Sequence, residues 1–172
     1  MYEAGISSGT GRHTPINNGT WSGERGNSIW IPGDKSVLED IQLYSEGMGH
    51  RVNGIEYRDG YADFSPVAIY TTTLSELLYE RTDESQFLDC ALDMRSEMED
   101  NARLIPPDRS IIQWFDGGSG IEIIGRGQAG IPGYTWHHDT QNGRIQLVPT
   151  SIHRACLHEG GRSLWGGGQG RR

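Results

Sequence analysis

Four of the six histidines fall within residues 137–158, as the pair His137-His138 and as His153 with His158. Imidazole is a common ligand for divalent metals, and a metal that keeps one open coordination position is typical of a catalytic site. A neutral histidine beside such a site can accept a proton from water. Three ligands and one base are what single-metal hydrolysis of a phosphodiester needs, so the cluster predicts this chemistry or, alternatively, a structural zinc site.

The residues around these histidines predict a strand, a turn, a second strand and a helix. Residues 134–139 have the aromatic and β-branched content of a strand, and Asn-Gly at positions 142–143 is a strong hairpin signal. Residues 144–148 predict the return strand. The proline at position 149 suits the first turn of a helix, which we expect to continue to residue 157 before a Gly-Gly pair ends it.

This arrangement brings the histidines together only under two conditions. Neighbouring strand residues point to opposite faces, so His137 and His138 share one site only near a twisted or bulged strand end. His153 and His158 would lie about 140° apart around a helix axis, because each residue turns the helix by about 100°. They converge only if the helix ends between them and the Gly160-Gly161 turn folds His158 back.

The rest of the chain predicts an α+β protein with additional helices and a small N-terminal hairpin. Residues 1–28 are rich in Gly, Ser, Thr and Asn, which predicts a flexible lead-in followed by a single domain over residues 29–172. The best helical candidate is residues 74–104, with a possible break at Thr82-Asp83. The other expected elements are a helix over residues 37–43 capped by Asp34 or Ser36, a hairpin over residues 55–61 around Asp59-Gly60, and a short strand or turn over residues 121–124.

Composition excludes several classes of protein. With 172 residues, 34% of them hydrophobic, and 25 glycines, the chain is long enough for one domain with a modest core and many loops. No run approaches the ~18 apolar residues of a membrane span, and the N-terminus lacks the pattern of a secretory signal. Two cysteines, Cys90 and Cys156, are too few for a disulfide framework and predict one bridge or two buried thiols.

The net charge of -8 conceals an asymmetry along the chain. Residues 1–100 hold 7 basic and 18 acidic residues, whereas residues 101–172 hold 8 arginines and 5 acidic residues. A local excess of arginine beside the histidines indicates contact with nucleic acid, since guanidinium groups bind phosphate bidentately. The acidic face of residues 76–100 predicts a solvated surface or a docking surface for a partner. The candidate phosphate contacts are Arg126, Arg144, Arg154 and Arg162.

Several strings resemble the WHH nuclease domain of bacterial polymorphic toxins, a branch of the HNH/endonuclease VII (His-Me finger) superfamily. They are Gly-Tyr-Thr-Trp-His-His at residues 133–138, Ile-Gln-Leu-Val-Pro at residues 145–149, His153, and His-Glu-Gly-Gly at residues 158–161. Upstream, residues 26–32 and 54–66 resemble the Gly-Asn-Ser-x-Trp and Asp-Phe-Ser elements that often precede such toxin nucleases. The chain departs from the pattern at Ile145, where the family has Met.

The resemblance implies a His-Me finger ββα-metal core over about residues 133–165, which cleaves phosphodiester bonds of DNA with one divalent ion of Mg, Mn, Ni or Zn. By position, His138 is the general base and His137, His153 and His158 are the metal ligands. The alternative is that His137 is the base. Gln146 lies on the second strand near the Asn of the superfamily and is expected to orient the base. The five-residue step between His153 and His158 fits the WHH pattern and not the four-residue step of colicin-type sites.

The resemblance also implies a biological setting. Such domains form the C-terminal toxin part of a secreted protein, which is delivered into a target cell and acts in its cytoplasm during interbacterial competition. A cognate immunity protein is then an expected partner, with the acidic face of residues 76–100 as a candidate docking surface. Two other functions stay open at this point, namely an RNase of the same fold and a non-catalytic binding module stabilised by zinc.

Overall fold

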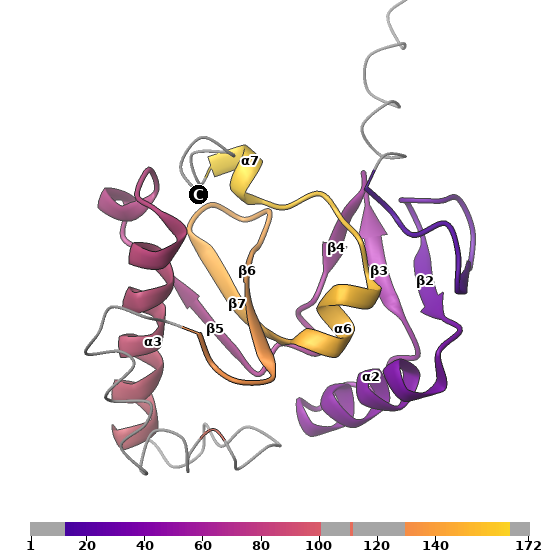
Figure 1. Ribbon diagram of the computed structural model, residues 1–172, viewed down its shortest axis with the longest axis horizontal. Helices are drawn as coiled ribbons and strands as arrows, with labels where there is room; N and C mark the ends of the chain where they lie inside the picture. Colours follow the sequence, from indigo (N-terminus) through magenta and orange to yellow (C-terminus); the bar gives the residue numbers. More distant parts are fainter. Residues whose placement is uncertain (1–12, 101–110, 112–129, 166–172) are drawn as a thin grey trace, which may run out of the picture. The chain divides into compact units, whose positions relative to one another are not determined.

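The computed structural model describes residues 13–100, 111 and 130–165 (Figure 1). The chain divides into two compact units, Met1–Ala68 with Val148–Gly160 and Ile69–Leu147 with Gly161–Arg172. Both units mix small antiparallel sheets with helices, so the predicted α+β class is confirmed. Each unit is described in turn.

The first unit is built on a four-stranded antiparallel sheet with the order β1-β2-β3-β4 (Figure 1). Its strands are β1 Gly19–Trp21, β2 Ile29–Pro32, β3 Ile55–Arg58 and β4 Tyr61–Asp63. Strand β1 lies inside the segment predicted as a flexible lead-in, so that prediction is wrong for this part of the chain. The physical reason is Trp21, whose ring packs 5.2 Å from the ring of Trp30 and 4.9 Å from that of Tyr57, measured between centroids.

Two local signals of the first unit give the structures they predict. Asp34 caps helix α2, Lys35–Gly47, because its carboxylate accepts a hydrogen bond from Ser36 N–H at 2.9 Å. Asp59 and Gly60 both have positive φ, 51° and 83°, as a tight hairpin turn between β3 and β4 requires.

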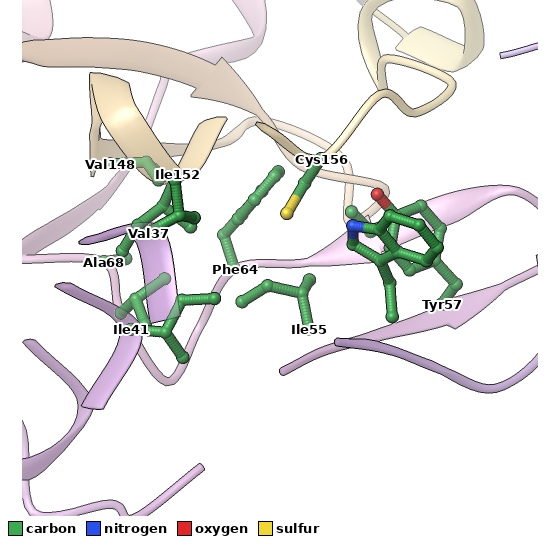
Figure 2. Close-up of a cluster of buried hydrophobic side chains, with 12 residues drawn as sticks. Val37, Ile41, Ile55, Tyr57, Phe64, Ala68, Val148, Ile152 and Cys156 are labelled. Atoms are coloured by element: carbon green, nitrogen blue, oxygen red, sulfur yellow. The ribbon is translucent and has the colours of Figure 1, made fainter. Parts of the chain in front are cut away.

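Helix α6, Thr150–Ala155, packs against α2. The core between these elements is fully buried and centres on the aromatic ring of Phe64, with Ile41, Ile55, Tyr57, Ile152 and Cys156 around it (Figure 2).

The second unit is built on a three-stranded sheet with the order β5-β7-β6. Its strands are β5 Tyr70–Thr73, β6 Tyr134–His138 and β7 Arg144–Pro149, and Thr71 of β5 lies opposite Gln146 of β7 in antiparallel register. Helix α3, Asp83–Asp100, packs against β5 (Figure 1). It follows the short 3₁₀ helix η1, Glu76–Leu78, so the predicted break at Thr82-Asp83 is confirmed. The unit ends with helix α7, Arg162–Trp165.

Two further predictions meet the structure here. Cys90 and Cys156 are free, buried thiols, which decides between the two alternatives. None of the helices formed by the described residues is long and apolar enough to cross a membrane. The strand or turn expected over residues 121–124 and the helix end expected over residues 101–104 lie outside the described residues.

Candidate active site

The turn between β6 and β7 is fixed by a glycine and by an ion pair. Gly143 has a φ of +75°, and a side chain added there would collide with the hydroxyl of Tyr79. Asp139, directly after β6, is only 3% exposed, and its carboxylate accepts hydrogen bonds from Gln141 N–H at 3.1 Å and from Arg144 Nε–H at 2.7 Å. The Arg144 Nη2 also lies 2.6 Å from Asp139 Oδ2. The hairpin that carries His137 and His138 is therefore held rigidly at its turn.

Helix α6 ends before His158, so His153 and His158 are not held about 140° apart as they would be on one continuous helix. The last helical residue is Ala155, and Cys156 leaves the helix with φ -119° and ψ 74°. His158 consequently folds back, and its ring meets that of His153 edge-on with centroids 4.8 Å apart. Both rings also contact Phe64, which stacks on His153 at 5.4 Å and meets the edge of His158 at 5.0 Å. The convergence predicted for this pair is thus achieved by an early helix end.

The surroundings of this pair keep both imidazoles neutral. Burial, with a smaller contribution from nearby His158, lowers the pKa of His153 to about 4. Burial also lowers the pKa of His158, although its hydrogen bond to the Cys156 carbonyl opposes this effect. That carbonyl lies 2.6 Å from His158 Nδ1 and can only accept, so Nδ1 carries the proton and Nε2 keeps its lone pair. A neutral imidazole whose second nitrogen donates to a carbonyl is the usual form of a metal ligand.

Two histidines of the first unit have the chemistry of metal ligands. The rings of His153 and His158 lie together, and burial keeps both imidazoles neutral. Neutral imidazoles are donors found in catalytic zinc sites, where three of them leave a fourth position open for water or substrate. The residues present therefore fit a divalent transition metal, and His137 of the second unit stays the predicted third ligand. The assignment of individual roles stays a prediction.

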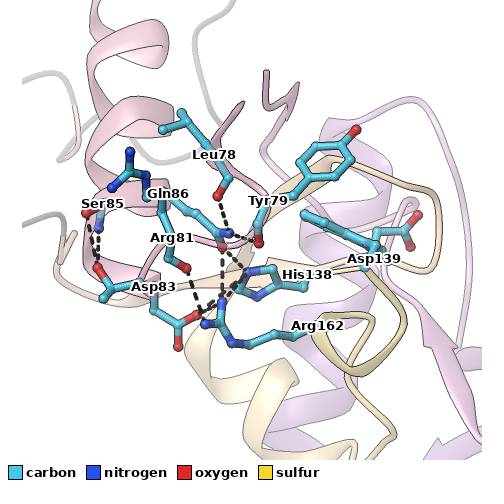
Figure 3. Close-up of polar contacts among 11 residues, drawn as sticks. Leu78, Tyr79, Arg81, Asp83, Ser85, Gln86, His138, Asp139 and Arg162 are labelled. Carbon is cyan, nitrogen blue, oxygen red and sulfur yellow. Dashed lines mark hydrogen bonds and ion pairs between the residues drawn. The ribbon is translucent and has the colours of Figure 1, made fainter. Parts of the chain in front are cut away.

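His138 belongs to a different set of contacts, formed within the second unit (Figure 3). Its side chain is 7% exposed, and its Nε2 lies 2.7 Å from Oε1 of Gln86 and 3.7 Å from Oδ1 of Asp83, both on α3. Arg162 of α7 donates to the same Gln86 oxygen at 3.1 Å and forms an ion pair with Asp83. The ring of Trp165, also on α7, packs 5.3 Å from that of His138. The residue expected to be the base is thus held by groups far away in the sequence.

The structure gives the surroundings of the other predicted site residues, whose roles stay predictions. Gln146 is fully buried on β7, and Gln86 contacts His138. Arg144 pairs with Asp139 and Arg162 with Asp83, so both guanidinium groups have internal partners. Arg154 of α6 is exposed, as a phosphate contact must be. Arg126 lies outside the described residues.

One signal for Gln86 was present in the sequence. Gln86, Cys90 and Met94 recur every four residues and are all buried on α3. A polar residue on such an apolar stripe needs an internal hydrogen-bond partner, because an unpaired amide is costly to bury. Asp83 and Arg162 carried no comparable signal, since charged residues at helix starts and near chain ends are common on surfaces.

The fold is mixed α+β, and the hairpin that carries His137 and His138 is followed by a short helix that carries His153. Comparison with known families gives a match over this segment. Residues 126–168 match the WHH family, described as a nuclease of the HNH/ENDO VII superfamily with conserved WHH. The match covers β6, β7, α6 and α7 and supports a nuclease function for the chain. No curated protein and no solved structure gave a match.

Proposed function

We propose that this protein is a metal-dependent endonuclease that hydrolyses the phosphodiester bonds of DNA with little sequence specificity. The observation that carries the proposal is the contact between the neutral rings of His153 and His158, within the segment that matches a nuclease family. His137, in the same segment, is the proposed third ligand. Three imidazoles favour Zn²⁺ or Ni²⁺ over Mg²⁺, which prefers oxygen ligands. A divalent ion held there stabilises charge on the phosphate and on the leaving 3′ oxygen.

His138 is the general base of the proposed reaction. His138 directly follows His137 on β6. Its ring packs against the rings of Phe87 and Trp165, with centroid distances of 5.1 Å and 5.3 Å. An imidazole held in this way accepts a proton from the attacking water with little reorganisation. The alternative is that His137 is the base, and His138 is preferred because its ring is held by contacts with Gln86, Phe87 and Trp165.

Substrate binding is proposed to depend on Arg154 more than on the other arginines. Arg154 is exposed on α6 next to His153, whereas Arg144 and Arg162 are engaged by carboxylates. A phosphate contact of this kind carries no information about base sequence, which is why we expect low sequence specificity. Nothing in this geometry requires a 2′-hydroxyl, so DNA is the proposed substrate and RNA cleavage is a possible outcome of the test.

The biological role is proposed from the resemblance to toxin nucleases. We infer that the chain is an antibacterial effector that is delivered into a target cell, acts on DNA in the cytoplasm, and is neutralised by a cognate immunity protein in the producer. The proposed docking surface is the acidic segment of residues 76–100, in which Glu84, Asp93, Glu97 and Glu99 of α3 are exposed. Coexpression with candidate partners, followed by loss of plasmid cleavage, is the corresponding test.

A plasmid cleavage assay tests the catalytic proposal. Supercoiled plasmid is incubated with the protein and Zn²⁺, Ni²⁺, Mn²⁺ or Mg²⁺, with and without EDTA, and total RNA is digested in parallel. We expect nicking that requires a metal, is abolished in His138→Ala and His153→Ala, and persists in His50→Ala, which changes an exposed histidine outside the group. Wild-type nicking by His138→Ala would exclude this residue as the base. Melting on chelation with no cleavage by any metal would instead identify a structural zinc module.

A further inference from the structure

We propose that Gln86 is a positioning residue that fixes the tautomer of His138, so that Nδ1 is the ring nitrogen able to accept a proton. The consequence for catalysis rests on the proposed role of His138 as base. Gln86, Asp83, Arg162 and His138 all lie in the second unit, and Gln86 and Asp83 stand outside the segment that matches the nuclease family (Figure 3). The residues proposed to orient His138 from α3 therefore do not belong to the segment that matches the family.

The orientation of the Gln86 amide follows from two backbone carbonyls. Gln86 is fully buried, and its Nε2 donates to the carbonyl of Leu78 at 2.7 Å and to that of Tyr79 at 2.8 Å (Figure 3). Carbonyl oxygens only accept, so the amide nitrogen must face them. The opposite atom, Oε1, is consequently the one that faces His138. A flipped amide would place its oxygen against two carbonyl oxygens and remove the N–H donor that both of them share.

The tautomer of His138 follows from this orientation. Gln86 Oε1 lies 2.7 Å from His138 Nε2 and can only accept, so Nε2 must carry a proton and donate it to Gln86. In a neutral imidazole the other nitrogen, Nδ1, then holds the lone pair. A general base needs that lone pair, and a buried acceptor on the far side of the ring ensures that it is always on the same nitrogen.

Arg162 and Asp83 hold Gln86 Oε1 in place. Arg162 Nη1 donates to this oxygen at 3.1 Å and pairs with the Asp83 carboxylate, which starts the same helix one turn before Gln86. The 3.4 Å between Arg162 Nη1 and His138 Nε2 joins two donors, so Gln86 Oε1 is the acceptor that both share. Gly161 N–H donates to the His138 carbonyl at 3.0 Å and ties the Arg162 segment to β6.

The tautomer is measurable without any nuclease assay. Long-range ¹H–¹⁵N NMR spectra of the full chain at neutral pH distinguish a protonated from an unprotonated ring nitrogen, and signals are assigned to His138 by their loss in His138→Ala. We expect protonated Nε2 and unprotonated Nδ1 in the wild type. Gln86→Met removes the acceptor, so a mixture of tautomers is expected. Gln86→Glu keeps an oxygen facing His138 and is expected to keep the wild-type tautomer, with lower stability because its second oxygen meets the Leu78 and Tyr79 carbonyls.

Catalysis is measured on the same variants. In Gln86→Met we expect kcat for plasmid nicking to fall about tenfold to a hundredfold with KM unchanged. A misoriented base loses part of the rate enhancement of about 10²–10⁴-fold that general base catalysis contributes. Ser45→Ala is the matched control, since Ser45 is also a fully buried polar residue with backbone hydrogen bonds but lies in the first unit. It is expected to lower stability and leave both the tautomer and kcat unchanged.

The possible outcomes separate the inference from the proposed function. A wild-type His138 protonated on Nδ1, or a Gln86→Met protein with an unchanged tautomer, would overturn the inference. The wild-type spectrum alone decides the first point, even if Gln86→Met fails to fold. The predicted tautomers combined with no cleavage by any metal would leave the role of Gln86 intact and refute the nuclease.

Discussion

Arg144 and Arg154 are expected to have separable roles, although the sequence alone makes both of them phosphate contacts. Arg144 binds Asp139 through Nε at 2.7 Å and Nη2 at 2.6 Å, and the side chains are 31% and 4% exposed respectively. Arg154 is exposed on α6. We therefore predict that Arg144→Met destabilises the fold with little change in DNA binding, and that Arg154→Met weakens DNA binding with little change in stability.

The size of the first effect follows from what Arg144→Met leaves behind. The Asp139 carboxylate stays buried and keeps its bond from Gln141 N–H at 3.1 Å, but it loses its only described ion-pair partner. Removing one member of a fully buried pair destabilises a protein by about 3–5 kcal/mol. Because Arg144 is 31% exposed, solvent already weakens this pair, and we expect a loss of about 2 kcal/mol. An exposed substitution such as Arg154→Met changes stability by less than about 0.5 kcal/mol.

Two measurements check this pair of predictions. Urea unfolding followed by tryptophan fluorescence should show a midpoint lower by roughly 1 M in Arg144→Met, given a slope of about 1–3 kcal/mol per molar. Fluorescence anisotropy with a labelled duplex in metal-free buffer, repeated over a range of salt, reports phosphate contacts through the slope of affinity with salt. Arg154→Met should reduce that slope by about one. If Arg144→Met unfolds at the wild-type urea concentration and reduces the salt slope, the structural role of Arg144 is refuted.

Three further predictions concern the site and its supports. His158→Ala should weaken Zn²⁺ binding by at least roughly 100-fold in titration calorimetry, because losing a residue that only hydrogen-bonds to a ligand already weakens binding about 10–100-fold. A Zn²⁺ affinity equal to that of His50→Ala would exclude His158 as a ligand. Tyr57→Phe removes the 2.9 Å hydrogen bond to the Leu157 carbonyl, beside His158, and should lower the free energy of unfolding by about 1–2 kcal/mol in urea; an unchanged midpoint would show that water replaces the hydroxyl. Gly161→Ala would place Cβ against the Asp139 and His138 carbonyls, and a melting temperature equal to the wild type would contradict the expected loss of about 3 kcal/mol.

The parts of the fold that the sequence predicts well are those with local causes. The cap at Asp34, the positive-φ pair Asp59-Gly60 and the glycine at position 143 each fix the backbone through neighbours a few residues away. The hairpin that carries His137 and His138 and the helix that carries His153 follow from such signals, and His158 lies shortly after that helix. The candidate ligands could therefore be named from the sequence before any geometry was known.

The parts that could not be predicted depend on distant segments. Strand β5 contains three threonines and no apolar alternation, and it becomes a strand by pairing with β7, far along the chain. The same is true of β1, which is ordered by the packing of Trp21. The surroundings of His138 come from α3, β6 and α7, and only the folded chain brings Gln86 and Arg162 to one imidazole.

The hydrogen bonds made by two histidines support a division of roles within the cluster. His158 donates from Nδ1 to the Cys156 carbonyl, which leaves Nε2 with the lone pair. His138 donates from Nε2 to Gln86, which leaves Nδ1 with the lone pair. The chain thus holds these two imidazoles in opposite tautomers, by a backbone acceptor in one case and a side-chain acceptor in the other. A purely structural metal site needs no histidine with a fixed tautomer besides its ligands. A catalytic metal centre with a separate general base does need one, because the base must keep its lone pair on the nitrogen that faces the water. The contact between Gln86 and His138 is therefore a stronger argument for catalysis than the number of histidines.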